Sequence, residues 1–248
     1  MTPSSQDLES PNIPGRFTLV KNWLNDGLAV ATTRNRLAAL RWWAEGQPPE
    51  RDGSPNDHYG IPDRQFVTND SKAKTVTTEV LEKVRDMYVR MSLELQQAFG
   101  LRREEAIKII PSYANRSDTL VLKDTWTKGG KARELPIRSP EQREVLDRAH
   151  QLAGRGSLIP ANRNYVEQLR LYEGHTGHAG LSKLHGLRHA FAQHRYHELT
   201  GWASPAAGGP DSKSLTPEQK VRDTDARRTI SRELGHEREA ITAVYLGR

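Results

Sequence analysis

The chain has 248 residues, a formal net charge of +6, a sequence pI near 9.6 and no cysteine. Without cysteine it can form no disulfide framework, thiolate zinc site or cysteine nucleophile, which excludes small secreted scaffolds and zinc fingers and favours a reducing cytosol. No apolar run approaches the roughly 18 residues of a membrane helix, and the N-terminus lacks the features of a secretory signal, so we expect a soluble, cytoplasmic protein.

Positive charge is unevenly distributed along the chain. Residues 1–64 contain seven basic and eight acidic side chains, a net charge of −1, so the remainder carries +7. A surplus of this size is common in soluble proteins, but its concentration in one part of the chain favours an anionic partner there. Residues 1–15 are rich in proline, serine and asparagine and are predicted to be a flexible tail.

Two helices are predicted within residues 16–46, which we interpret as a small helical region. Apolar spacing predicts one helix from Phe17 to about Gly27, and Thr32 or Thr33 is predicted to cap the next. In this second helix the side chains expected to face a core are Leu37, Leu40 and Trp43. Its arginines are expected to face either solvent or a phosphate backbone; they are Arg34, Arg36 and Arg41.

A linker is predicted at residues 47–66, because the stretch 47–64 contains four prolines and two glycines. A second domain is expected at 67–248. Its first element is predicted to be a long amphipathic helix that starts at Thr77 or Thr78 and continues to about residue 98. Gly100 is predicted to end this helix, and LRREEAIKII, residues 101–110, is predicted to form a shorter one.

A β-hairpin follows, and it is the only hairpin that the sequence predicts with clear signals. Its strands are predicted at about 119–123 and 134–137, joined by a turn that contains Gly129 and Gly130. Ser139 is then predicted to cap a helix whose first residue is Pro140. Further helices are predicted at about 163–172, 181–199, 217–234 and 237–246. A loop rich in glycine, proline and serine, at about 200–216, is expected to be a mobile insertion.

Six of the nine histidines lie between His175 and His197, which raises the possibility of a metal site. His185 and His189 have the i, i+4 spacing that places two imidazoles on one helix face. However, Gly186 stands where zinc proteases carry a glutamate, and the next turn offers no acidic third ligand. We therefore expect no metal site.

A second set of residues accounts for more of the sequence motifs than a metal site does. It combines the first arginine of GLRREE, the first lysine of the hairpin turn TKGGKAR, and the first histidine and the arginine of HGLRH. The histidine of LGH and a tyrosine nine residues further on complete it. In chain order the set is Arg102, Lys128, His185, Arg188, His236 and Tyr245. In order and spacing this set resembles the catalytic residues of the tyrosine recombinase family, the phage integrases and their relatives, over about residues 75–248.

The resemblance implies a mainly α fold with a small β-hairpin: an α+β catalytic domain, preceded here by a reduced helical region that binds DNA. It also implies site-specific cutting and rejoining of duplex DNA, with no metal, ATP or other cofactor. The expected partners are double-stranded DNA and further copies of the chain, as a homotetramer in the recombination synapse. The expected location is the bacterial cytoplasm, with the nucleoid.

The chemistry of phosphodiester cleavage supports these residue types. Arg102 and Arg188 can clamp the phosphate with paired hydrogen bonds, and His236 can add a third donor. A phenol ordinarily has a pKa of about 10, so a nucleophilic Tyr245 needs a proton acceptor such as His185.

The remaining roles concern the leaving group and the surroundings of the site. The leaving 5′ oxygen needs a proton, which the hairpin lysine Lys128 can supply; Lys131 competes for this role, although the family pattern favours Lys128. Glu105 resembles the family's acidic position that orients the first arginine. DNA contacts are also expected from Lys131 and Arg133, besides the three arginines of the N-terminal helix.

Three features depart from the family pattern. Arg188 and His236 are 48 residues apart, a longer gap than usual, and the excess coincides with the loop at about 200–216. Only three residues follow Tyr245, and the N-terminal helical region is short. Two alternatives therefore stay open: DNA relaxation in the manner of type IB topoisomerases, and a DNA-binding regulator that has lost catalysis.

Overall fold

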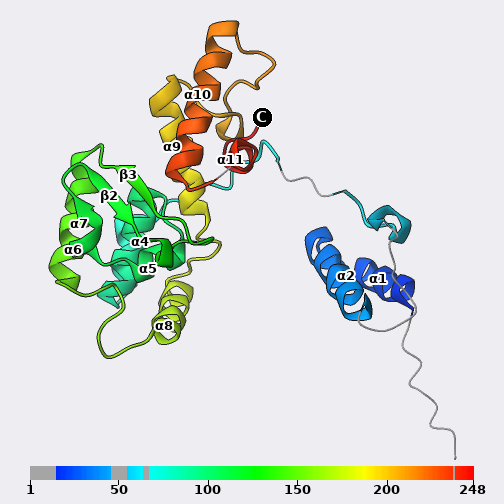
Figure 1. Cartoon of the computed structure of the whole chain (residues 1–248), viewed down its shortest axis with the longest axis horizontal. Coiled ribbons are helices and arrows are strands. Elements are labelled where there is room, and N and C mark those ends of the chain that lie inside the picture. Colours follow the sequence, from blue (N-terminus) through cyan, green and yellow to red (C-terminus); the bar gives the residue numbers. More distant parts are fainter. Residues whose placement is uncertain (1–14, 46–54, 64–66, 237) are drawn as a thin grey trace, which may run out of the picture. The chain divides into compact units, whose positions relative to one another are not determined.

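The computed structural model describes residues 15–45, 55–63, 67–236 and 238–248. The chain divides into two compact units, Met1–Phe66 and Val67–Arg248, and each is described by itself (Figure 1). Apart from Gly15, the expected tail lies outside the described residues. The elements of the first unit are α1 (Arg16–Asn25), α2 (Val30–Glu45) and the 3₁₀ turn η1 (Asn56–Tyr59).

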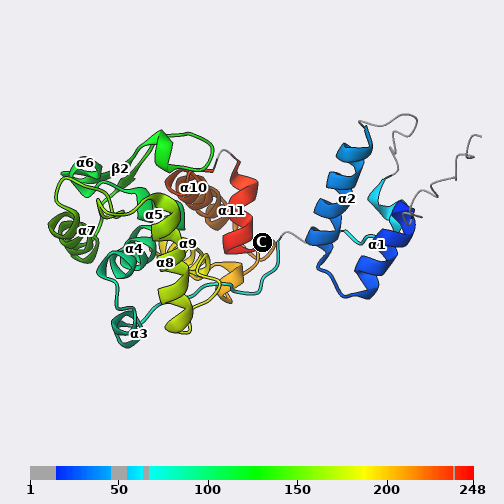
Figure 2. The same ribbon diagram turned by 90° about the horizontal axis from the view of Figure 1, so that it is seen from below.

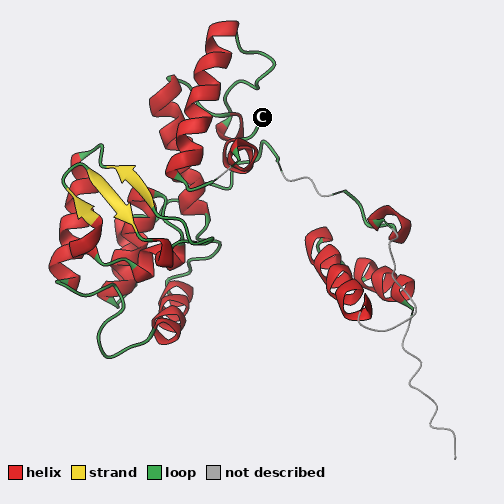
Figure 3. Cartoon of the chain, in the orientation of Figure 1, coloured by secondary structure: helices red, strands yellow, loops and turns green. Residues whose placement is uncertain are grey.

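The second unit is mainly helical and carries three short strands, which confirms the predicted fold class (Figure 3). Its elements in chain order are α3 (Thr78–Lys83), α4 (Met87–Phe99), α5 (Arg103–Lys108), α6 (Pro111–Ala114), β1 (Asn115–Arg116), β2 (Thr119–Leu122), η2 (Asp124–Trp126), β3 (Arg133–Pro136), α7 (Pro140–Ala153), α8 (Tyr165–His178), α9 (Gly186–Thr200), η3 (Pro205–Ala207), α10 (Pro217–Glu233) and α11 (Glu239–Leu246). In the described part of the chain, no helix is long and apolar enough to cross a membrane.

The first unit has a small core between α1, α2 and the segment around η1. Its buried side chains are Val20, Leu37, Tyr59 and Ile61. Residues 55–63, expected to belong to the linker, thus supply two of these four side chains and pack as part of the unit. The rest of the expected linker, 47–54 and 64–66, lies outside the described residues.

Helix α2 differs from its prediction in two respects. It begins at Val30, so the two threonines lie inside its first turn, where the Thr33 hydroxyl donates to the Ala29 carbonyl at 3.4 Å. Leu37 is fully buried as expected, but Trp43 is 61% exposed and its neighbour Trp42 is 78% exposed. The prediction that Trp43 faces the core is therefore wrong.

The long helix predicted from Thr77 or Thr78 to about residue 98 is two helices, α3 and α4. Val84 has an extended backbone that ends α3. Asp86 then caps α4, because its carboxylate accepts the Tyr88 and Val89 amides at 2.9 and 3.0 Å. The amphipathic pattern continues across the break because the partly buried Val80 and Leu81 of α3 pack against the same core cluster as residues of α4.

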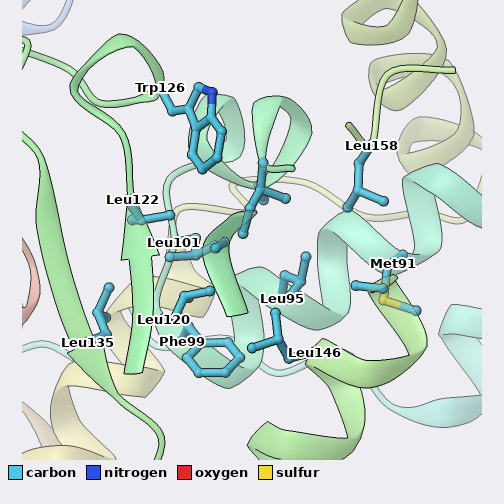
Figure 4. Close-up of a cluster of buried hydrophobic side chains, with 14 residues drawn as sticks. Met91, Leu95, Phe99, Leu101, Leu120, Leu122, Trp126, Leu135, Leu146 and Leu158 are labelled. Atoms are coloured by element: carbon cyan, nitrogen blue, oxygen red, sulfur yellow. The ribbon is translucent and has the colours of Figure 1, made fainter. Parts of the chain in front are cut away.

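The sheet has the antiparallel order β1–β2–β3, with Leu120 opposite Leu135. The hairpin between β2 and β3 is confirmed, and the two-residue strand β1 was not predicted. Leu120, Leu122 and Leu135 are buried against α4, where Phe99 lies beneath the sheet (Figure 4). This core fixes the hairpin to the end of α4, immediately before the segment that contains Arg102.

Helix ends further along the chain follow their capping residues. Ser139 caps α7 as predicted, by accepting the Gln142 amide at 3.2 Å. Helix α8 begins two residues later than predicted, after Asn164, and continues to His178. Helix α9 begins at Gly186 instead of Leu181, and α10 has its predicted start at Pro217.

The segment at about 200–216 is more than a surface insertion. Ser204 and Ala206 are buried, and η3 contacts α11. Gly247 follows α11 at a φ of +75°, and a Cβ there would lie only 2.8 Å from the Ala206 amide nitrogen. The close approach requires glycine and packs part of the expected mobile loop against the last helix.

Candidate active site

Five of the six predicted catalytic residues lie at or near helix ends in the second unit. Arg102 directly precedes α5, and His185 directly precedes α9, whose first turn contains Arg188. His236 follows α10, and Tyr245 lies in the last turn of α11. Helices α9, α10 and α11 pack against one another, as Figure 2 shows.

Gly100 allows the Arg102 segment to approach α9. It ends α4 in the left-handed region, at a φ of +61°. A Cβ at this position would lie 2.5 Å from Cδ1 of Phe191, a residue of α9. Only glycine therefore fits both the conformation and the contact.

Tyr245 is the residue around which the side chains of the site gather. Its side chain is nearly buried, and its hydroxyl lies 3.1 Å from Nε2 of His185. The ring centroids of His189 and His236 lie 4.6 and 5.5 Å from that of Tyr245. The Arg188 guanidinium lies 5.9 Å from the phenol centroid. The structure thus brings four of the six predicted residues together, and His189 as a fifth neighbour.

Arg188 is almost completely buried, with 1% of its surface exposed. Its guanidinium donates to the Gly100 carbonyl at 2.5 Å and to the Leu234 carbonyl, and it lies 3.5 Å from Nε2 of His236. Burial, together with the nearby Arg102, lowers the pKa of Arg188 to about 10. The guanidinium therefore keeps its charge at neutral pH, close beneath the Tyr245 ring.

Arg102 is held by a carboxylate three residues further on. Glu105 is fully buried, and it accepts hydrogen bonds from the Arg102 amide at 2.7 Å and from Arg102 Nη1 at 2.8 Å. The same carboxylate accepts two hydrogen bonds from Arg133, both at 2.7 Å. Burial tends to raise the pKa of Glu105, but the hydrogen bonds and charge of Arg133 dominate and hold that pKa at about 2.

The position of Arg133 differs from the expected DNA contact. Its side chain is only 8% exposed, and besides Glu105 it binds the Glu233 carbonyl through Nε at 3.1 Å. The guanidinium thus faces the protein interior. The sequence around Arg133 does not predict this inward orientation, because its partner Glu105 lies 28 residues earlier in the chain.

The histidines of the site are uncharged at neutral pH. Burial, followed by the charges of Arg188 and Arg102, lowers the pKa of His185 and brings that of His236 to about 4. Burial and the neighbouring His185 bring the pKa of His189 to about 4 as well. Neutral imidazoles have an unprotonated ring nitrogen, so His185 Nε2 can accept the phenol proton.

Lys128 makes no contact with the four residues gathered around Tyr245 or with Arg102 in the described part of the chain. Lys128 lies at the exposed tip between β2 and β3, next to Gly129 and Gly130, which have φ of +92° and +66°. Within the described chain, it makes no hydrogen bond or ion pair with another residue. The backbone of Lys131 is tied to Thr127, whose hydroxyl donates to the Lys131 carbonyl at 2.6 Å.

The three arginines of α2 make contacts within the first unit. Arg34 donates to the Pro62 carbonyl at 2.8 Å and pairs with Asp63 at 2.9 Å. Arg41 donates to Asn56 at 2.9 Å, and Arg36 lies over the Trp23 ring at 5.5 Å. Arg34 and Arg41 thus hold the segment 55–63 against α2, and DNA contact by these residues stays a prediction.

The site contains two further groups that the sequence does not predict. The sequence presents His189 only as a possible metal ligand, although its i+4 spacing from His185 already places it on the same face of α9. Across the described residues, no group of three or more histidine, aspartate or glutamate side chains is placed to hold a metal ion.

The second group that the sequence does not predict holds the end of α11 in place. Gln193 donates to the Tyr245 carbonyl at 3.1 Å and accepts from the Ser71 hydroxyl at 3.1 Å. Asn69 exchanges two hydrogen bonds of 3.0 Å with the Arg248 backbone. Asn69 and Arg248 are 179 residues apart, and no sequence pattern connects them.

A cavity of about 480 Å³ opens beside the site, with Arg102 and His185 among its lining residues. Arg103 and Lys183 add positive charge to its wall, and Glu173 adds a carboxylate that pairs with Arg103 at 2.9 Å. Two arginines, three neutral histidines and a phenol beside an open basic cavity form a site suited to a phosphate and an oxygen nucleophile.

The family model described as integrase matches residues 64–194, more than half of the chain. The chain therefore belongs to the integrase family, the tyrosine recombinases. None of the curated proteins matches this sequence.

Solved structures of this family share the fold of the chain at low identity. A lambda integrase dimer bound to a COC′ core site has a TM-score of 0.56 and 13% identity, over 94% of this chain and 64% of that one. A lambda integrase tetramer bound to a Holliday junction has a TM-score of 0.52, with the same identity and coverage. The Tn1549 transposon integrase bound to circular intermediate DNA has a TM-score of 0.53 and 13% identity, over 94% and 80% of the two chains. XerH recombinase bound to difH has a TM-score of 0.50 and 17% identity, over 94% and 67%.

Proposed function

We propose that the chain is a site-specific DNA recombinase that cuts and rejoins duplex DNA through a 3′-phosphotyrosyl intermediate on Tyr245. The observation that carries the proposal is the 3.1 Å contact between the Tyr245 hydroxyl and the neutral His185, next to the charged Arg188. Membership of the integrase family supports the same reaction.

In the first step, the Tyr245 oxygen attacks the phosphorus atom and its proton passes to Nε2 of His185. Arg102 and Arg188 donate to the nonbridging oxygens, where negative charge accumulates in the transition state, and His236 contributes a further ring nitrogen. The bond between phosphorus and the 5′ oxygen breaks as the bond to Tyr245 forms. The adduct keeps the energy of the phosphodiester, so a 5′-hydroxyl can reverse the step without ATP.

The leaving 5′ oxygen takes a proton from Lys128. The exposed hairpin tip suits this role because a lysine there can reach into a groove of bound DNA without steric conflict with the core. Lys131, on the same turn, is the competing donor. In the DNA-free protein Lys128 stands apart from the site, so binding of DNA must bring the tip and the phosphate together.

Double-stranded DNA is the proposed partner, and the proposed assembly is a homotetramer. The lambda integrase tetramer on a Holliday junction supports this assembly through the shared fold. The second unit carries the positive surplus of the chain, which supports DNA binding through its phosphates and predicts a strong salt dependence. We propose that Arg34, Arg36 and Arg41 add contacts from the first unit.

Trapping of the covalent adduct tests the proposal. Nicked duplexes with random sequence around the nick lose a short fragment on cleavage, so the adduct accumulates and migrates slowly on a denaturing gel. We expect an adduct with the wild-type chain and none with Tyr245→Phe. Tyr165→Phe is the matched control, because the Tyr165 hydroxyl makes no hydrogen bond to another described residue, and it should form the adduct normally.

Two other outcomes would each indicate a different function. Retention of DNA by the wild type without any adduct would indicate a binding protein without catalysis. An adduct accompanied by relaxation of plasmids of any sequence, with no exchange of strands between duplexes, would indicate a topoisomerase. Sequencing the DNA in the adduct would at the same time reveal the cleavage site.

A further inference from the structure

Arg133 contacts three elements of the candidate site at once. It is the first residue of β3, and its guanidinium donates through Nη1 and Nη2 to the two oxygens of Glu105. Its Nε donates to the carbonyl of Glu233, the last residue of α10. One side chain therefore ties the hairpin to the start of α5 and to the end of α10.

Through Glu105, Arg133 determines where Arg102 lies. The Glu105 carboxylate is fully buried and is shared by the two guanidiniums, at 2.7 Å from Arg133 and 2.8 Å from Arg102. A buried carboxylate is stable only when its charge is matched and its lone pairs are filled. Arg133 binds both oxygens of Glu105 and shares Oε1 with Arg102, so it fixes the orientation in which Glu105 holds Arg102.

Arg133 also packs against the turn that leads to His236. Gly235 has a φ of +66°, and a Cβ at this position would lie 3.0 Å from Cδ of Arg133. The aliphatic part of Arg133 therefore fills the space beneath the Leu234–His236 turn, while Nε holds the preceding carbonyl. The conformation of this turn determines where the His236 ring lies relative to Arg188.

We propose that Arg133 is a positioning residue that aligns Arg102 and His236 on the scissile phosphate and anchors the hairpin that carries Lys128. This inference rests on the proposed strand transfer at Tyr245. Arg133 itself does not touch DNA: its guanidinium is turned inward, and only 8% of its side chain is exposed.

The test separates DNA affinity from the chemical step. Arg133→Lys keeps the charge but loses the paired hydrogen bonds to Glu105. We expect the rate of adduct formation at saturating DNA to fall by about tenfold to a hundredfold, since small displacements of catalytic groups have effects of this size. The dissociation constant for DNA should change by less than about threefold. Arg116→Ala, which removes a positive charge from the exposed edge of the same sheet, should leave the rate unchanged.

The pH profile provides a readout that a general structural role would not alter. In the wild type Glu105 stays ionised at any working pH, because its pKa is about 2. Without the Arg133 guanidinium that pKa rises, so the adduct rate of Arg133→Lys should begin to fall at a higher pH than that of the wild type. Glu105→Gln should lower the rate as strongly, and the double variant should be no slower than the slower single variant, because both changes remove the same interaction.

Each result has a definite meaning. A wild-type chain without any adduct refutes the proposed function and the positioning role with it. If the wild type forms the adduct and Arg133→Lys does so at the same rate and with the same pH profile, the positioning role alone is refuted. A weaker affinity with an unchanged rate at saturating DNA would make Arg133 a DNA contact and overturn the inference. Fully multiplicative effects of Arg133→Lys and Glu105→Gln would overturn it too.

Discussion

Replacing Glu105 with glutamine should remove a pH-dependent part of the stability of the second unit. The carboxyl has a pKa of about 2 in the folded chain, against an ordinary value of 4.5, because Arg133 and Arg102 hold its charged form. A difference of this size corresponds to about 3 kcal/mol of stability at neutral pH, at about 1.4 kcal/mol for each pH unit. Because the folded pKa is depressed, this stability is present above pH 4.5 and is lost as the pH falls toward 2.

Urea denaturation of the wild type and of Glu105→Gln, repeated between pH 7 and pH 2, measures this contribution. Glutamine has nearly the same shape as the acid but no charge, so at low pH the protonated wild type should resemble the variant. The difference in unfolding free energy should therefore shrink by about 3 kcal/mol between pH 5 and pH 2. Glu134→Gln is the matched control, because it removes a carboxylate from the exposed face of the same strand that carries Arg133.

A difference between the wild type and Glu105→Gln that stays constant over this pH range would mean that the two guanidiniums do not favour the charged form of Glu105. An equal loss in Glu134→Gln would instead trace the pH dependence to the general charge balance of the second unit.

Three further predictions concern the nucleophile, its helix and the core. Burial lowers the pKa of His185, so adduct formation should persist at pH values below the ordinary pKa of histidine. It should fall only when the pH is low enough to protonate His185, which a pH profile of the single-turnover rate checks. Asn69→Ala should speed amide hydrogen exchange in α11, because it frees the Arg248 backbone, whereas the exposed Asn162→Ala should not. Leu120→Ala should destabilise the second unit by about 2–5 kcal/mol in the same urea assay, because Leu120 is fully buried between the sheet and α4; a loss below 1 kcal/mol would contradict its place in the core.

Local signals in the sequence predict much of the helical framework. Ser139 with Pro140 marks a helix start by the chemistry of capping, and this start appears as predicted, as does the start at Pro217. Local signals do not predict the break at Asp86, because one amphipathic pattern spans both helices and hides the single capping residue between them. They do not predict strand β1 either, because two residues carry no periodicity.

Sequence patterns do not predict the contacts that complete the site, because these contacts join residues that are distant in the chain. The spacing of HGLRH and LGH identifies residues that the structure indeed brings together around Tyr245. Arg133 points inward because it pairs with Glu105 in another element, whereas the sequence analysis predicts a DNA contact for it. Burial of Ser204 beside α11 is a matter of packing, which a glycine-rich loop sequence does not reveal.

Peptide mapping of the trapped adduct shows whether Tyr245 is the residue that becomes joined to DNA. Digestion of the adduct with protease and nuclease, followed by mass spectrometry, locates the residue that carries the nucleotide. We expect a single modified peptide with Tyr245 bonded to a 3′ phosphate, and a free 5′-hydroxyl on the released strand. A nucleotide on any other residue, or a bond to a 5′ phosphate, would contradict the proposed role of Tyr245.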